Sequence, residues 1–193
     1  MEIKFKYIAV GVLCMFILVI NSCSNKRSDR QTFEDDYEQI LESKIITLEK
    51  ENINSKLNNQ YLFIGNDSLN KKTLKNFTSQ KKLFFYFSEN TCAPCIDETI
   101  EIIKKVFPSY IHDERIVFIS PDYPVRFRDD FHKKKLLTLE RHKLGIPLEI
   151  TEVPFFFILN DKLEIESIHI VNKTKFFKTE KYLQKIAQKL GFR

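Results

Sequence analysis

The sequence predicts an α/β protein in which helices flank a central sheet, and three observations support that class. Short apolar runs, as expected of strands buried on both faces, occur at 83–87 (LFFYF), 116–119 (IVFI) and 155–159 (FFFIL). Segments with helical periodicity alternate with these runs. The composition, 43% hydrophobic and 30% charged over 193 residues, is that of a globular chain. From residue 83 on, the predicted order is βαβαββα, an α/β sandwich.

The N-terminus resembles an export signal. Lys4 and Lys6 precede an apolar run over 7–20, which as a helix would span about 21 Å, short of a hydrocarbon core about 30 Å thick. The run leads into Ile20-Asn21-Ser22-Cys23, which resembles the bacterial lipoprotein signal, whose Cys is lipidated. We expect a signal peptide over 1–22 and a chain lipid-anchored through Cys23 in the cell envelope, facing the periplasm. An uncleaved signal anchor, or ordinary cleavage nearby, is the alternative.

Two segments separate this signal from the main domain. Residues 23–33 are polar and predict a tether. Residues 34–57 predict an amphipathic helix, with acids in its first turns and apolar side chains at helical spacing, namely Tyr37, Leu41, Ile45 and Leu48. The helix is expected to lie on the domain. A stalk or a short coiled coil is the alternative.

The domain over 58–193 is expected to contain the remaining elements. Turn signals at Gly65-Asn66-Asp67 and Asn160-Asp161 follow two of the strands, and Gly191 follows the last helix. The predicted strands are 61–64, 83–87, 116–119, 155–159 and 164–171, and the predicted helices are 95–107, 127–144 and 177–190.

Composition also limits the function classes. Four Gly residues allow neither of the Gly-rich phosphate-binding motifs. The net charge of +5 is too small and diffuse to indicate nucleic-acid binding. Basic side chains gather only in segment 121–149, which predicts a solvated helix face or, alternatively, a docking surface for an acidic partner or an anionic membrane. These side chains are Arg126, Arg128, Lys133, Lys134, Lys135, Arg141 and Lys143.

The four Cys residues fall into separate roles. Cys14 lies in the signal and Cys23 is the expected lipid site, so Cys92 and Cys95 are the thiols of the folded domain. They lie between a strand and a helix, where N-terminal amides stabilise a thiolate. A structural zinc site would require a second cysteine pair, which the sequence does not contain. Attachment of haem would require a His at the position of Ile96. A copper site recruiting a distant His, either His112 or His169, and a purely structural disulfide remain open, but redox chemistry is favoured.

With these residues the chain resembles the thioredoxin superfamily, and most closely its TlpA/ResA-like membrane-anchored thiol–disulfide oxidoreductases. The motifs are LFFYFSENTCAPC, the acid Glu98, and Glu152-Val153-Pro154-Phe155 before a buried strand. The resemblance implies a thioredoxin-like three-layer sandwich with a central mixed sheet, plus the extra N-terminal helix. It also implies a cis Pro154 beside the disulfide.

The resemblance assigns roles to individual residues. Cys92 is expected to be the nucleophile and Cys95 the resolving thiol. Glu98, one helical turn from Cys95, is expected to accept its proton, or to be a solvated acid. Thr91, Val153 and Pro154 are the candidate substrate contacts, with the backbone of Val153 pairing with a substrate chain.

Two positions depart from the family pattern. Thr91 replaces the usual Trp, and Tyr86, expected to be core, stands where many thioredoxins have a buried acid.

The expected function is thiol–disulfide exchange on exported proteins, in the reductase direction. No cofactor beyond the Cys92–Cys95 disulfide and no metal is expected. The expected partners are exported dithiols or disulfides and a membrane electron donor, without nucleic acid, and the chain is expected to be a monomer. A redox-inactive adaptor lipoprotein of the same fold is one alternative, and a copper chaperone is another.

Overall fold

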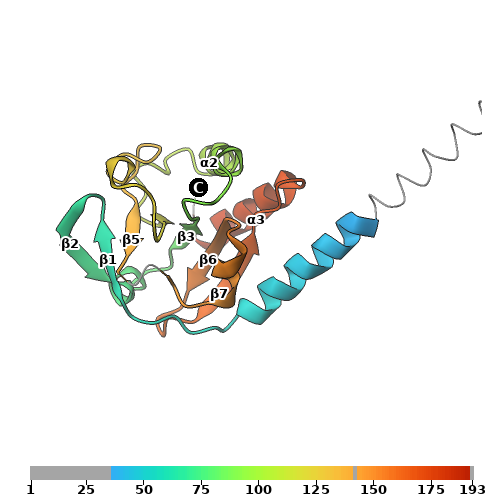
Figure 1. The fold of residues 1–193 in the computed structure, drawn as a ribbon, viewed down its shortest axis with the longest axis horizontal. Coiled ribbons are helices and arrows are strands. Elements are labelled where there is room, and N and C mark those ends of the chain that lie inside the picture. Colours follow the sequence, from blue (N-terminus) through green and yellow to red (C-terminus); the bar gives the residue numbers. More distant parts are fainter. Residues whose placement is uncertain (1–35, 141–142, 192–193) are drawn as a thin grey trace, which may run out of the picture. The chain divides into compact units, whose positions relative to one another are not determined.

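The computed structural model describes residues 36–140 and 143–191 (Figure 1). The signal segment, Cys14, Cys23 and the tether lie outside this part of the chain. The chain divides into two units, 1–46 and 47–193, and residues 36–46 of the first are helical. Within the described ranges, no helix is long and apolar enough to cross a membrane.

The second unit is built on a mixed seven-stranded sheet. Its strands lie side by side in the order β2-β1-β5-β4-β3-β6-β7. β3 and β4 pair in parallel, as do β4 and β5, while the other neighbours are antiparallel. The predicted α/β class and mixed sheet are therefore confirmed. The strands are β1 Tyr61–Ile64, β2 Asp67–Thr73, β3 Leu83–Tyr86, β4 Ile116–Ile119, β5 Leu137–Leu139, β6 Phe155–Leu159 and β7 Ile165–Ile170.

Two helices, α2 (Ala93–Val106) and α3 (Phe176–Lys189), cover one face of this sheet (Figure 1). Phe85 is fully buried beneath them, and its ring lies 4.7 Å from that of Phe156 on the neighbouring strand. Buried aliphatic side chains of both helices complete the core: Ile96, Ile100, Ile103, Leu183 and Ile186. Because Cys92 caps α2 and Cys95 lies in its first turn, this burial fixes the position of the cysteine pair relative to the sheet.

On the opposite face, aromatic rings stack between β3 and β6. Phe84 lies on Phe157 and Tyr86 on Phe155, with centroids 4.9 and 4.6 Å apart. A 3₁₀ turn, η3 (Pro147–Thr151), meets this face, since the Tyr86 hydroxyl bonds to its Glu149. This turn follows the segment 127–144, for which the sequence predicted a helix.

The predicted helix over 127–144 is wrong. The segment contains β5 and a tight turn, with His132 and Lys133 at positive φ (48° and 66°), a conformation that no α-helix accommodates. Lys134 donates from Nζ to the carbonyls of Tyr110 and Asp113, so its ammonium group is held within the fold. β2 was also not predicted, because its sequence DSLNKKT is almost wholly polar.

Helical conformation in 36–52 ends earlier than predicted, before Asn54, whose φ is 65°. The chain then runs antiparallel beside β7. The amide of Asn54 donates to the Ile165 carbonyl (2.9 Å), the amide of Ile165 donates to Ser55 (3.0 Å), and the amide of Leu57 donates to Leu163 (2.9 Å). Residues 54–57 therefore form a short bridge beside the start of β7, centred on Lys56 and Glu164.

Candidate redox site

The cysteine pair lies at the carboxyl end of β3, in the loop that opens α2. Cys92 and Cys95 form a disulfide, with Cα atoms 5.3 Å apart. Cys92 is exposed and Cys95 is half-buried. Cys92 is therefore the more exposed residue of the pair.

The start of α2 supplies hydrogen-bond donors to Cys92. Cys92 is the N-cap residue, and its Sγ accepts from the amide of Cys95 at 3.2 Å. Its carbonyl accepts from the amides of Cys95 and Ile96. Pro94, in the first turn, has no N–H to leave unpaired. Once the disulfide is reduced, this amide and the helix dipole favour a thiolate at Cys92.

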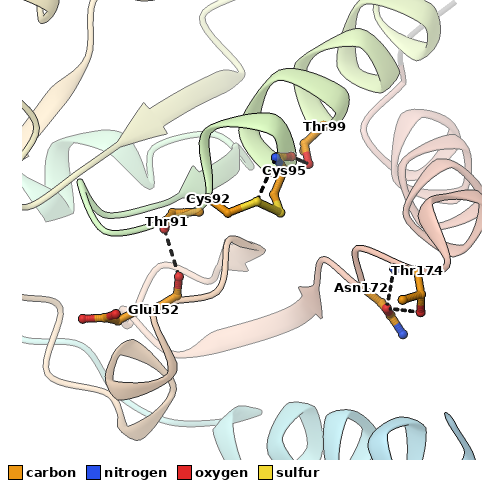
Figure 2. Close-up of a disulfide and its surroundings, with 7 residues drawn as sticks. All are labelled: Thr91, Cys92, Cys95, Thr99, Glu152, Asn172 and Thr174. Carbon is orange, nitrogen blue, oxygen red and sulfur yellow. Dashed lines mark hydrogen bonds between the residues drawn. A yellow bond between two sulfur atoms is a disulfide. The ribbon is translucent and has the colours of Figure 1, made fainter.

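Thr91 connects the cysteine loop to the loop before β6. Its hydroxyl accepts from the amide of Ser88 and donates to the carbonyl of Glu152, both at 3.0 Å. Figure 2 shows this second bond beside the disulfide. Asn90 adds a bond from Nδ2 to the Glu152 carboxylate. Thr91 is only 6% exposed, so the structure makes it a link between two loops rather than an open contact surface.

The expected cis bond at Pro154 is absent, since the described residues contain no cis peptide bond. The trans form is favoured by about 0.5–1 kcal/mol. The left-handed backbone of Glu152 (φ 53°) makes the turn into β6 instead. Pro154 is buried and its carbonyl accepts from Val171, which extends the pairing of β6 with β7.

Val153 stays available to a partner chain. It is half-buried, and its backbone N–H and C=O make no hydrogen bond with other residues in the described ranges. The adjoining Glu152 carbonyl is bonded to Thr91, which is next to Cys92. The role of Val153 as a substrate contact stays a prediction.

Glu98 and Cys95 lie on α2, but the structure shows no bond between their side chains. Glu98 is exposed. The neighbouring Thr99 instead donates to the Cys95 carbonyl at 2.6 Å. The role of Glu98 as a proton acceptor stays a prediction.

Sequence reasoning missed the carboxylate beside Tyr86. Tyr86 is buried, and its hydroxyl donates to Glu149 at 2.9 Å. Burial, and then the Glu149 charge, raise the pKa of Tyr86 above its ordinary value. Glu149 also accepts from the amides of Leu144 and Gly145. Pro147, two residues before the acid, is the sequence signal typical of such a turn start.

A cavity of about 520 Å³ adjoins the cysteine loop. Ser88 and Asn90 line it from this loop. Three carboxylates line it against a single ammonium, and Ile150 on its wall is 86% exposed. This cavity therefore suits a substrate segment with basic and apolar side chains. The charged lining residues are Asp122, Glu149, Glu152 and Lys143.

The described residues contain no group of three or more His, Cys, Asp or Glu side chains that could hold a metal ion. His169, the sequence candidate for a copper ligand, lies near Thr179 (Nε2 to Oγ1, 3.0 Å) and Glu49 (Nδ1 to Oε1, 3.3 Å). His112 is exposed.

Comparisons with known proteins gave likenesses to solved structures. No family model and no curated protein matches the chain. A PrxQ mutant from Xylella fastidiosa is 15% identical, with a TM-score of 0.45, covering 72% of this chain and 96% of that one. A thiol:disulfide interchange protein from Bacteroides sp. is 15% identical (TM-score 0.41; 67% and 90%). A DsbF homologue from Corynebacterium diphtheriae is 16% identical (0.41; 66% and 85%). At these values we draw no functional argument from the likenesses.

Proposed function

We propose that this protein carries out thiol–disulfide exchange through Cys92 and Cys95, in the reductase direction. The observation that carries the proposal is the placement of the pair. An exposed cysteine caps a helix and accepts an amide hydrogen bond at its sulfur, while its partner is half-buried one turn later. A purely structural disulfide of this spacing would add little stability, because it closes a very short loop.

The reaction runs in two balanced steps. The Cys92 thiolate attacks one sulfur of a partner disulfide, so that a mixed disulfide forms and the other partner sulfur leaves as a thiolate. The Cys95 thiolate then attacks Cys92 Sγ, forming the Cys92–Cys95 disulfide and releasing the second partner thiol. The partner gains two electrons and two protons. A membrane electron donor with a dithiol would return the pair to the reduced state.

The substrates would be exported proteins, held beside Val153 and beside the cavity that Asp122, Glu149 and Glu152 line. Thr91 acts as a positioning residue, because it ties the cysteine loop to the loop that carries Val153. Pro154 supports the same loop from within the fold. Glu98 is proposed as the proton acceptor for Cys95, reached through solvent.

Insulin reduction in the presence of dithiothreitol tests the activity. The wild type should accelerate precipitation of the insulin B chain. Cys92→Ser should abolish the acceleration, because no thiolate can attack. Cys95→Ser should instead accumulate a mixed disulfide with its partner, which in the native host identifies the substrate. Equal turbidity curves for the wild type and Cys92→Ser would exclude the enzyme and leave the redox-inactive adaptor.

We also propose that the chain is anchored through a lipid on Cys23 and faces the periplasm, on the basis of the sequence signal at 20–23. Cys23→Ser should move the protein from the membrane fraction to the soluble fraction, because a single cysteine carries the anchor. Circular dichroism should show an unchanged fold. Retention of this variant in the membrane fraction would contradict the lipid site.

A further inference from the structure

A second cavity lies at the opposite end of β3 from the disulfide. Lys82 directly precedes β3 and Ile116 begins the parallel strand β4, whereas Cys92 follows the other end of β3. The volume is about 540 Å³, within the range of small-molecule sites. Its walls come from β1, from β2 and the segment after it, from residues 111–117 around the start of β4, and from residues 133–137.

The lining of this cavity, called the lysine cavity below, has an excess of positive charge. One carboxylate, that of Glu114, faces five lysines, which are Lys72, Lys82, Lys133, Lys134 and Lys135. Three of the lysines, Lys72, Lys133 and Lys135, are exposed, and their ammonium groups make no hydrogen bond or ion pair with other residues in the described ranges. Lysines of a solvated helix face would point apart, but these converge on one cavity from two distant segments.

The other two lysines are fixed in the wall. Lys82 is 7% exposed and donates from Nζ to the Glu114 carbonyl at 2.8 Å. Lys134 is held by backbone carbonyls, including that of Tyr110 at 2.7 Å. Burial lowers the pKa of both, while the charges of Asp113 and Glu114 raise it. Lys72 lowers the pKa of Lys82, and Lys82 lowers that of Lys134. An anion placed among the ammonium groups would offset their mutual repulsion.

We propose that the lysine cavity binds a ligand carrying two or more phosphate charges. Its cations are all lysines, which bind phosphate as point charges, and no Arg offers the planar fork suited to a lone carboxylate. Asn76, Ser79 and Gln80 add neutral polar groups. Apolar side chains, including Phe77 and Val117, leave room for an organic portion. A soluble phosphate compound and a lipid headgroup share this chemistry.

Calorimetric titration of the full chain, as Cys23→Ser, with inorganic tripolyphosphate tests the proposal. The cavity variant combines Lys72→Gln, Lys133→Gln and Lys135→Gln. The matched control combines Lys162→Gln, Lys173→Gln and Lys185→Gln, which removes equal charge from exposed positions outside the cavity. Flotation with phosphatidylcholine vesicles, with and without phosphatidic acid, forms the second arm.

The cavity variant should bind tripolyphosphate roughly tenfold more weakly or worse, while the control keeps its affinity. The same pattern on phosphatidic acid vesicles alone would identify a lipid headgroup as the ligand. Three results would overturn the proposal: no binding in either arm, equal weakening in the cavity and control variants, or binding of poly-glutamate without tripolyphosphate, which would indicate an acidic protein partner. None of these results bears on the redox reaction, which insulin reduction measures separately.

Discussion

The two ends of β3 handle polar groups in opposite ways. At the disulfide end, Thr91, Glu152, Tyr86 and Glu149 are hydrogen-bonded to one another or to backbone, and the exposed reactive group is a sulfur. At the lysine end, three ammonium groups make no bond within the described ranges. Covalent chemistry requires fixed geometry, whereas attraction of an anion requires only charge. The hydrogen-bonded cysteine loop and the charged lysine cavity thus lie at opposite ends of one strand.

The two ends also respond oppositely to pH. Burial lowers the pKa of Lys82 and Lys134, so the unfolded chain binds more protons than the folded one just below the ordinary lysine value of 10.5. Their contribution to stability therefore rises as the pH rises toward 10.5. The raised pKa of Tyr86 has the opposite sign, and its contribution is lost as the pH rises above 10.0.

The largest effect in this comparison is expected at Thr91. Thr91→Val leaves the Ser88 amide and the Glu152 carbonyl without their shared partner, and should lower the free energy of unfolding by about 1–3 kcal/mol. Thr138 in β5 is the matched control, because its buried hydroxyl has no hydrogen-bond partner among residues 36–140 and 143–191. Thr138→Val should be neutral or stabilising. Urea unfolding compares the two, and an equal loss would mean that the Thr91 bonds do not hold the site.

An intermediate effect is expected from Tyr86 at high pH. In the wild type, the free energy of unfolding should fall between about pH 10 and 12, by at most about 1.4 kcal/mol per pH unit for one proton. Tyr86→Phe should remove this part of the pH dependence, because phenylalanine has no hydroxyl proton to lose. Tyr37→Phe, at an exposed position, serves as the control. A slope unchanged in Tyr86→Phe would contradict the assignment.

The smallest effect is expected at the lysine end. The cavity variant, with Lys72, Lys133 and Lys135 replaced by Gln, should keep its free energy of unfolding within about 1 kcal/mol of the wild type, or gain slightly as like charges are removed. Thermal and urea unfolding measure this. A larger loss would show that these lysines stabilise the fold instead of leaving charge available for a ligand.

Elements with a strong local pattern could be predicted from the sequence. The runs LFFYF, IVFI and FFFIL gave β3, β4 and β6, because strands buried on both faces must be continuously apolar. The prediction of a helix over 127–144 was wrong because the segment turns at His132 and Lys133, which have positive φ. The run LLTL at 136–139, followed by Gly145 and Pro147, is the signal that could have indicated a strand.

At the site, the sequence indicated the cysteine pair better than the hydrogen bonds that hold the surrounding loops in place. The position of CAPC between a strand and a helix follows from local rules of helix capping. The bonds from Thr91 to Glu152 and from Tyr86 to Glu149 join residues 61 and 63 positions apart, and no local pattern encodes such pairs. The trans bond at Pro154 was missed because the prediction came from a resemblance, whereas Glu152 provides the turn in this chain.

The pairing of residues 54–57 with β7 has a consequence for the isolated domain. An unpaired β7 would present a row of backbone donors and acceptors at the edge of the sheet, which neighbouring molecules can extend into aggregates. The chain itself covers the start of that edge, at Leu163 and Ile165. The opposite edge is β2, where Lys71 and Lys72 oppose such association. A fragment beginning at Asn58 would lose the residues that cover the start of β7.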